Sequence, residues 1–402
     1  MKMSMYGLAL ALVAPSALGF NQEIRARFTP DPSQPQKNVF INQTPNSGYC
    51  ATYPDECRMN ETFSIRAPIN FGPKGPMLPM AGVSIRVPAY WRQITVTNSD
   101  TLETEIVEVR ISGIGSNYVL SNTAASLTGE TDILEGHRKL WGGLSWVYAP
   151  ANCLYSGVGA YGPNTYRFFW KTPSEGDCTK VTSFRIPFMS FDTLDFAYEL
   201  RTPNPLGMSS GLYTGSINYL LNGAARDFNI GDMVANDSNL TLDFVLDVQH
   251  TLKVDIPPGG NHIVLEPQGG WSSWLDQGRP PTRLLRDQTF LISASSRFKM
   301  SLECELDLTD GCGIIDRESG YAGLVNVSVS LPHGLTDSGG KPAMRVPLNR
   351  EDSATFQPGV YVDRKPGTLH FDVAERETAF FVRNSKGRPY KGNITVIWDS
   401  EV

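Results

Sequence analysis

Arginine is the side chain in this sequence best suited to bind a charged ligand. Residues 20–237 contain twelve arginines and five lysines. The flat guanidinium group presents a fork of N–H donors that matches a carboxylate, such as that of sialic acid, better than an ammonium group does. For each arginine, an ordinary surface or ion-pair role is the alternative. The arginines that we select as candidate ligand contacts are Arg66, Arg138, Arg167 and Arg201.

The most aromatic stretch of the chain is residues 141–170, where nine of thirty residues are Phe, Trp or Tyr. Aromatic rings stack on the CH-rich faces of sugars, and fixed polar groups beside them can bind the sugar hydroxyls. The alternative is that these rings fill the core of a β-sandwich. The rings that we select as candidate ligand contacts are Trp141, Trp146, Tyr148 and Tyr161.

Six cysteines fall into three pairs that are close in the sequence. Fifteen pairings are possible, and we favour the three local ones. Their spacing does not suit zinc and the five histidines are scattered, so we expect no metal and no cofactor. Disulfides would form in an oxidising compartment such as a bacterial periplasm. The expected disulfides are Cys50–Cys57, Cys153–Cys178 and Cys304–Cys312.

This sequence gives little support for a catalytic function. There is no phosphate-binding loop of the G-x-x-x-x-G-K-[ST] type and no H-E-x-x-H. Acidic pairs such as Asp55-Glu56 are ordinarily solvated, and a glycosidase needs two carboxylates placed in three dimensions. We therefore expect no enzymatic activity. The alternative, if the protein is an enzyme, is a secreted glycoside hydrolase.

Alternating apolar and polar residues predict an all-β protein made of two β-sandwich domains. The longest alternation, Leu240 to Ile256, keeps its apolar residues on one parity and is broken only by His250. A period of two is typical of a β-strand with one buried face, as in antiparallel sandwiches. The run is about three times an average strand, so we expect a bend or a change of sheet near His250.

Composition and patterning divide the chain into three parts. Residues 1–19 have the charged start, short apolar run and small-residue cleavage site of a secretory signal peptide. We interpret the polar segment Asn222 to Asn239 as a linker. This gives a first domain at 20–237 and a second domain at 238–402, and the long strand is the first strand of the second domain. Phe20 to Asn46 reads as an extended leader along the surface. The net charge of −6 argues against a nucleic-acid partner.

The last strand of the chain has an apolar face formed by Ile394, Val396 and Trp398. It ends close to the C-terminus, so the sequence supplies no later strand to lie beside it. An exposed strand edge of this kind invites the addition of a strand from another protein.

Three segments resemble a known family. The ending YKGNITVIWDSEV is similar to the C-terminal strand of chaperone-usher pilins. The segments GYCATYPDEC…FSIRAPI and GLVNVSVSLPHGLTDSGGKP resemble tip-adhesin or initiator subunits of cable pili and colonisation-factor fimbriae. The resemblance implies an N-terminal sandwich that binds a host receptor and a C-terminal pilin domain with an incomplete immunoglobulin-like fold.

On this resemblance, a periplasmic chaperone and then a donor strand from the major pilin would fill the place of the missing strand, and an outer-membrane usher would assemble the subunit. The protein would pass through the periplasm and end at the pilus tip on the cell surface, where it would bind a host glycan or glycoprotein. A structural initiator that binds no receptor is the alternative. The expected edges of the donor groove are Ile394, Val396 and Trp398 on one side and Leu242, Phe244 and Leu246 on the other.

Overall fold

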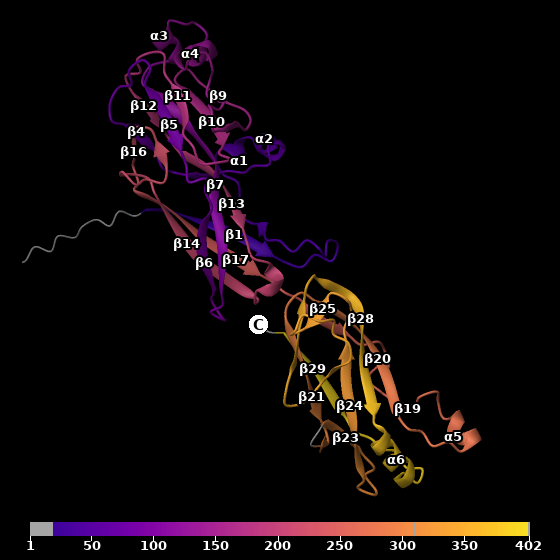
Figure 1. The fold of residues 1–402 in the computed structure, drawn as a ribbon. Coiled ribbons are helices and arrows are strands. Elements are labelled where there is room, and N and C mark those ends of the chain that lie inside the picture. The colour runs from indigo at the N-terminus through magenta and orange to yellow at the C-terminus, as the bar shows by residue number, and fades with distance from the viewer. Residues whose placement is uncertain (1–18, 309–310, 401–402) are drawn as a thin grey trace, which may run out of the picture.

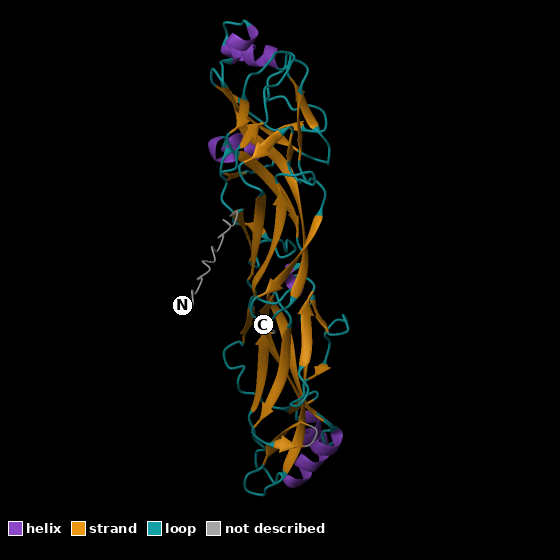
Figure 2. Ribbon diagram, turned by 90° about the vertical axis from the view of Figure 1, so that its left-hand side faces the viewer, coloured by secondary structure: helices purple, strands orange, loops and turns teal. Residues whose placement is uncertain are grey.

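The computed structural model describes residues 19–308 and 311–400. The chain is a rod of two units placed end to end, each with its own hydrophobic core (Figures 1 and 2). Strands far exceed helices in both units, as predicted, and helices cap the two far ends of the rod. No helix in the described ranges is long and apolar enough to cross a membrane. The predicted signal peptide lies outside the described residues except for Gly19.

The first unit is built on one large curled sheet and one small sheet. Short helices stand mostly at its ends and edges (Figure 1). The large sheet comprises β1 (Phe20–Phe28), β2 (Ile41–Asn42), β3 (Ile65–Ala67), β4 (Phe71–Pro73), β6 (Arg92–Asn98), β7 (Thr104–Leu120), β8 (Leu154–Tyr155), β9 (Ala160–Tyr161), β10 (Thr165–Lys171), β12 (Met189–Phe191), β13 (Leu194–Arg201), β14 (Gly211–Leu220), β16 (Met233–Ala235) and β17 (Asn239–Val248). The small sheet comprises β5 (Gly82–Arg86), β11 (Cys178–Val181) and β15 (Asn229–Ile230). The helices are α1 (Tyr49–Thr52), α2 (Pro54–Met59), α3 (Ala124–Thr128), α4 (Ile133–Leu140) and the 3-10 turn η1 (Pro205–Gly207).

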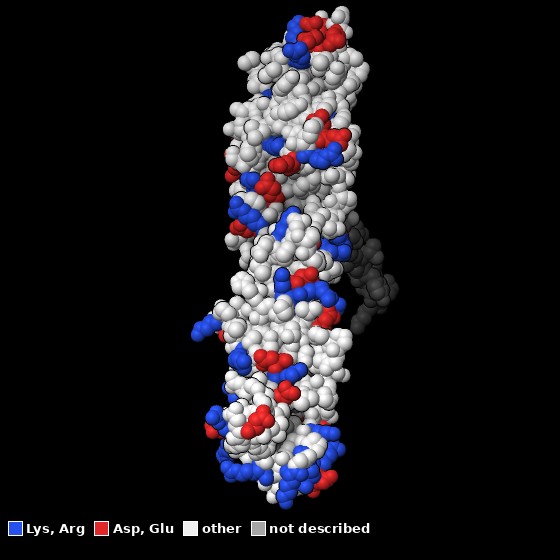
Figure 3. All heavy atoms as spheres, turned by 90° about the vertical axis from the view of Figure 1, so that its right-hand side faces the viewer, with Lys and Arg blue, Asp and Glu red and all other residues white. Residues whose placement is uncertain are grey.

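The second unit is a sandwich of two sheets. One comprises β18 (Leu252–Asp255), β19 (Glu266–Pro267), β20 (Leu284–Ala294), β22 (Asp307–Leu308), β23 (Gly311–Ile315), β24 (Ala322–Ser330), β26 (Val346–Pro347) and β28 (Val362–Val373). The other comprises β21 (Phe298–Cys304), β25 (Leu335–Asp337), β27 (Ala354–Pro358) and β29 (Ile394–Ser400). The helices are α5 (Ser272–Gln277) and α6 (Glu375–Asn384). On the face drawn in Figure 3 charges of both signs are interspersed, and basic residues gather at the far end of this unit.

The long alternating segment is interrupted at His250, as expected, but most of it belongs to the first unit. β17 lies between β1 and β14, whereas β18 pairs with β20 of the second unit. His250 occupies the crossing, where its ring nitrogens contact the Met208 carbonyl and the Ser295 hydroxyl. Strand pairing therefore passes from the first unit to the second after Val248, and not within the predicted linker at Asn222 to Asn239.

This pairing corrects one half of the expected donor groove. Leu242, Phe244 and Leu246 are buried in the middle of the first unit's sheet and border no free edge. The alternation correctly identified their buried face, but it carries no information about which strands lie on either side. The start of the expected surface leader is likewise a sheet strand, because β1 runs parallel to β17 and buries Ile24 and Phe28.

The structure joins the cysteines in the three pairs expected from the sequence. Cys50–Cys57 links α1 to α2, Cys153–Cys178 ties the aromatic segment to β11, and Cys304–Cys312 closes the hairpin of the second unit. Each bridge lies within one unit, so none of them connects the two cores.

Lys180 on β11 is a buried lysine whose ammonium group contacts two main-chain oxygens among the described residues. Its Nζ lies 3.2 Å from the Ser145 carbonyl and 3.4 Å from that of Leu144. Burial lowers the pKa of Lys180 to about 8. Between pH 8 and its unfolded value of about 10.4, the unfolded chain holds a proton that the folded chain has released, so stability rises with pH across this window.

We expect the melting temperature of the first unit to rise by roughly 2 °C between pH 7.5 and 9.5, a modest effect because water screens part of the burial cost. Differential scanning calorimetry of the full chain would measure it. The variant Lys180→Met should flatten this rise, and an equal rise in that variant would assign it to other groups.

Candidate functional site

The strongest candidate site lies where β3, β13, β7 and β10 cross one face of the large sheet. Asp195 on β13 is paired in register with Arg66 on β3 and with Gly115 on β7, and Gly115 is paired with Phe169 on β10. Arg167 stands two residues before Phe169, so its side chain lies on the same face. The sheet register thus brings two of the four selected arginines to one carboxylate.

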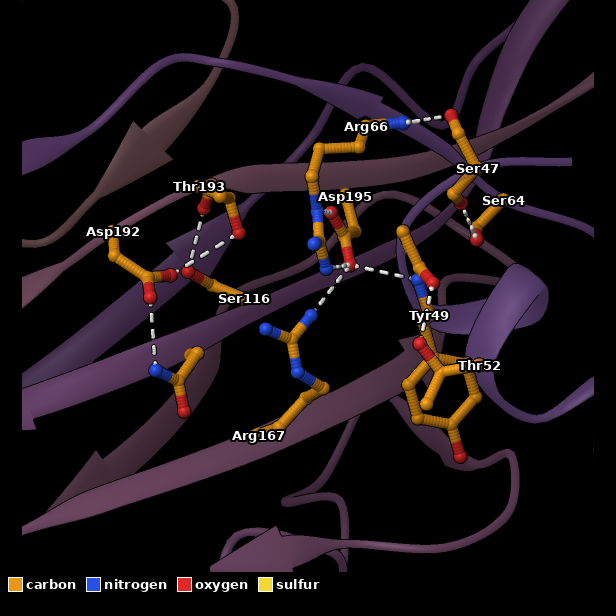
Figure 4. Close-up of polar contacts among 12 residues, drawn as sticks. Ser47, Tyr49, Thr52, Ser64, Arg66, Ser116, Arg167, Asp192, Thr193 and Asp195 are labelled. Carbon is orange, nitrogen blue, oxygen red and sulfur yellow. Dashed lines mark hydrogen bonds and ion pairs between the residues drawn. The ribbon is translucent and has the colours of Figure 1, made fainter.

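Both guanidinium groups bind Asp195 (Figure 4). Arg66 donates from Nε and Nη2 to the two carboxylate oxygens at 2.7 and 2.8 Å, and Arg167 Nη1 lies 3.5 Å from Oδ2. Asp195 is 0% exposed, whereas the side chains of Arg66 and Arg167 are 31% and 20% exposed. The carboxylate is therefore inside the protein, and the two arginine side chains partly reach its surface.

The disulfide loop above the sheet completes the coordination of Asp195. The backbone N–H of Tyr49 donates to Asp195 Oδ2 at 3.0 Å, and the Tyr49 ring stacks on Phe169 at 5.1 Å. Gly48 has a φ of 69°, and a Cβ at this position would stand 2.6 Å from Asp195 Oδ1. Glycine is therefore required for α1 to begin this close to the carboxylate.

Two guanidinium groups, those of Arg66 and Arg167, surround one fully buried carboxylate in this cluster. Burial raises the pKa of Asp195, and the Arg66 hydrogen bonds oppose that rise. The hydrogen bond to Asp195 raises the pKa of Arg66, so its guanidinium stays charged. One further acid, Asp192, lies at the flank, where it accepts from Asn117 Nδ2 at 2.9 Å. Arg167 donates a single N–H to Asp195 in the contacts between described residues, which leaves other N–H groups of its fork for a ligand.

The other two selected arginines lie elsewhere. Arg138 is on α4 at the far end of the first unit, where it pairs with Glu135 at 2.8 Å. Arg201 ends β13, six residues and roughly 20 Å along the strand from Asp195. The structure therefore does not gather all four arginines into one site.

The selected aromatic residues also separate. Trp141 and Trp146 are 3% and 0% exposed and pack in the core, so the structure corrects their selection as receptor contacts. Tyr148 and Tyr161 are 52% and 47% exposed and are available to a ligand. Both tryptophans are core residues, which is the alternative that the sequence left open.

Sequence reasoning missed Asp195, on which this site depends. The residue is a single acid among apolar neighbours in Leu194–Ala197, all of them buried. A buried carboxylate needs charged or hydrogen-bonding partners, so an acid inside an apolar strand was the available signal.

Three side chains with catalytic chemistry, Ser330, His370 and Asp287, form a row of hydrogen bonds across β24, β28 and β20. Ser330 Oγ lies 2.8 Å from His370 Nε2, and His370 Nδ1 lies 2.7 Å from Asp287. The backbone N–H of Arg345 donates to Ser330 Oγ at 3.0 Å. This N–H therefore binds the hydroxyl that would act as nucleophile, and not the oxyanion of a substrate. No trio of His, Cys, Asp or Glu side chains in the described part of the chain is placed to hold a metal ion.

A second candidate surface is the free edge of β29. Within the described residues β29 forms a ladder with β21 on one side and with no strand on the other. Val396 and Trp398 are only partly buried, although the residues beside them on β21, Leu302 and Met300, are almost fully buried. The core is thus covered along β21 and partly open along β29.

One ring contact and one buried N–H show that Trp398 faces inward. The Trp398 ring meets Phe290 of the opposite sheet edge-on at 5.7 Å, and its indole N–H is buried with no hydrogen-bond partner among the described residues. Across the sandwich, Leu252 and Val254 on β18 are also partly buried, and β18 pairs only with β20 in the described ranges. We call β29, with the row Ile394, Val396 and Trp398, the acceptor edge.

Among known proteins, only solved structures show similarity to this chain. No protein-family model and no curated protein matches the sequence. The chain is similar to CfaE, the adhesive subunit of the CFA/I fimbria of enterotoxigenic Escherichia coli, at 10% identity and a TM-score of 0.27, over 95% of this chain and 93% of that one. It is similar to a chaperone–tip adhesin complex of CFA/I fimbriae at 11% identity and a TM-score of 0.25, over 96% and 97% of the two chains. It is also similar to the CsuC–CsuE chaperone–tip adhesion subunit complex of Acinetobacter baumannii Csu pili, at 9% identity and a TM-score of 0.21, over 94% and 97%. Likenesses this loose do not establish that this chain shares the roles of those proteins.

Proposed function

We propose that this chain is the tip adhesin of a chaperone-usher fimbria. Its first unit binds a host-surface receptor, and its second unit joins the pilus by accepting a donor strand from a pilin. The observation that carries this proposal is the acceptor edge, where a half-buried apolar row lies beside an almost fully buried one. The resemblance of the last strand to those of chaperone-usher pilins supports the same assignment.

The acceptor edge has the two features that strand addition uses. The main chain of β29 offers N–H and C=O groups along a free side, and alternate apolar side chains leave room for those of a donor. Covering Ile394, Val396 and Trp398 would contribute roughly 1 kcal/mol for each half-buried side chain. A periplasmic chaperone would protect this edge first. At the usher, a pilin would then replace the chaperone, and the assembled protein would lie at the cell surface.

For the receptor, the Arg66, Asp195 and Arg167 cluster favours a glycan that carries a carboxylate, such as a sialylated one. Asp195 holds both guanidinium groups in place, and partly exposed forks recognise a carboxylate through paired hydrogen bonds. Receptor binding by this cluster distinguishes an adhesin from a structural initiator.

We expect Arg167→Gln to weaken binding of 3′-sialyllactose about tenfold or more, since hydrogen bonds to charged groups contribute about 1.5–3 kcal/mol each. Isothermal titration of the full chain would measure this affinity. Arg167→Lys should restore little of it, because an ammonium cannot form the fork.

The matched control is Arg138→Gln, which removes an exposed arginine on α4 and should leave the affinity unchanged. Equal binding of 3′-sialyllactose by a folded Arg167→Gln chain and by the unchanged chain would contradict an anionic receptor. Failure of the chain to bind any glycan or host cell would favour the structural initiator, and release of cleaved sugar would favour the glycoside hydrolase.

A further inference from the structure

The curled sheet of the first unit does not close on itself. From β7 it continues through β6, β14, β17, β1 and β2, while β13 lies on the other side of β7. In the described residues β2 pairs only with β1, and β3 covers β13 only at Leu194–Phe196. The free parts of β2 and β13 therefore form the two sides of an open seam.

A cavity of about 650 Å³ lies at this seam. Its lining comes from both sides, including Phe40 and Asn42 near β2 and Tyr198 to Thr202 at the end of β13. The Tyr198 hydroxyl reaches across to Asn42 Oδ1 at 3.3 Å. The volume falls within the range of about 300–1,000 Å³ that is typical of ligand pockets.

Aromatic rings form much of the wall of this seam pocket. Phe63 meets Tyr198 edge-on at 4.7 Å, and both line the cavity with Phe40 and Trp91. The guanidinium of Arg201 lies 4.0 Å from the centre of the Trp91 ring and that of Arg110 lies 5.0 Å from it. The two arginines contact the indole and add N–H donors to the wall of the pocket.

The charges of the seam pocket are balanced, unlike those of a site for an anion. Arg110 pairs with Glu199 at 2.7 Å and Arg201 pairs with Glu108 at 3.4 Å. Each guanidinium that lines the cavity therefore has its own carboxylate. A neutral ligand with an apolar face and both hydrogen-bond donors and acceptors fits such a wall, and saccharides have this combination.

An added peptide strand fits this edge less well. The β7–β13 ladder shifts register between Ala197 and Tyr198, which marks a bulge, and Glu199 and Arg201 place charges on the edge that follows. Bulges and charged side chains are devices that protect strand edges from pairing.

We propose that the seam pocket is a second binding site, specific for neutral saccharides. It lies roughly 20 Å along β13 from Asp195 and uses none of the residues of the Arg66, Asp195 and Arg167 cluster. The proposal depends on neither pilus assembly nor the anionic receptor.

Saturation-transfer NMR on the full chain tests this site with four neutral disaccharides: lactose, N-acetyllactosamine, chitobiose and mannobiose. At least one should bind, and Trp91→Ala should weaken it tenfold or more. Arg167→Gln should leave neutral binding unchanged while it weakens 3′-sialyllactose, so the two sites can fail separately. If Trp91→Ala unfolds the chain, Thr202→Trp, which fills the cavity from its lining, should abolish neutral binding in a folded protein.

Three results would overturn the proposal. They are the absence of binding by all four disaccharides, loss of neutral binding in Arg167→Gln, and unchanged neutral binding in a folded Thr202→Trp chain. Displacement of the bound disaccharide by an extended peptide of alternating valine and threonine would show instead that the seam accepts a strand.

Discussion

A chain that carries a donor segment fused after Val402 should melt roughly 10 °C higher in its second unit than the unfused chain. The segment would consist of a short turn and a strand with apolar residues at alternate positions, placed to pair with β29. It would cover Ile394, Val396 and Trp398 and add a ladder of main-chain hydrogen bonds. A gain of about 3–4 kcal/mol in a unit of this size corresponds to such a shift. Scanning calorimetry of the two full-length chains would measure it.

The matched control for this fusion is a donor of equal length whose apolar residues are replaced by serine and glutamate. It should leave the melting temperature nearly unchanged, because it offers a main chain but nothing to fill the open core. Val396→Lys in β29 should cancel most of the gain from the apolar donor, since it places a charge in the acceptor edge. An unfused chain that is monomeric, equally stable and slow to exchange the amides of β29 would contradict the proposed role of this edge.

The second large effect is expected at Asp195. Replacing it by alanine should lower the free energy of unfolding of the first unit by about 3–5 kcal/mol, the usual result of removing one partner from a buried ion pair. Arg66 would lose two hydrogen bonds, Arg167 its ion pair and the Tyr49 N–H its acceptor. Urea unfolding followed by the fluorescence of the buried tryptophans of the first unit would measure the change.

Two further variants separate charge from packing at this position. Asp195→Asn should cost less, because the amide oxygen can still accept from Tyr49 or Arg66. Asp195→Leu combined with Arg66→Met should recover much of the stability, since replacing a buried ion pair by apolar groups is often close to neutral. A loss below about 1 kcal/mol in Asp195→Ala would show that the carboxylate does not organise the cluster.

Local features of the sequence were enough for several parts of this structure. The cysteines paired as expected because each couple is close along the chain, with separations of 7, 25 and 8 residues. The alternation in Leu240 to Val248 correctly gave its buried face, and the interruption at His250 marked the change of unit. The apolar face of the last strand was equally visible in Ile394, Val396 and Trp398.

Which residues meet across the sheet was decided only by the tertiary structure. Alternation tells which side of a strand is buried but not its neighbours, so Leu242 to Leu246 were assigned to the wrong unit. Arg66 and Asp195 are 129 residues apart in the sequence, and only the register of β3 on β13 brings them together. Trp146 could have faced a ligand or the core from its sequence alone, and packing against Trp170 and Phe168 determined that it is buried.

The sequence by itself therefore determined the all-β class, the disulfides and the strand faces of this protein, because these depend on residues close along the chain. The tertiary structure alone decided the Arg66, Asp195 and Arg167 cluster and the seam pocket. These depend on which distant strands pair and at what register, and that outcome is set by the packing of the whole core.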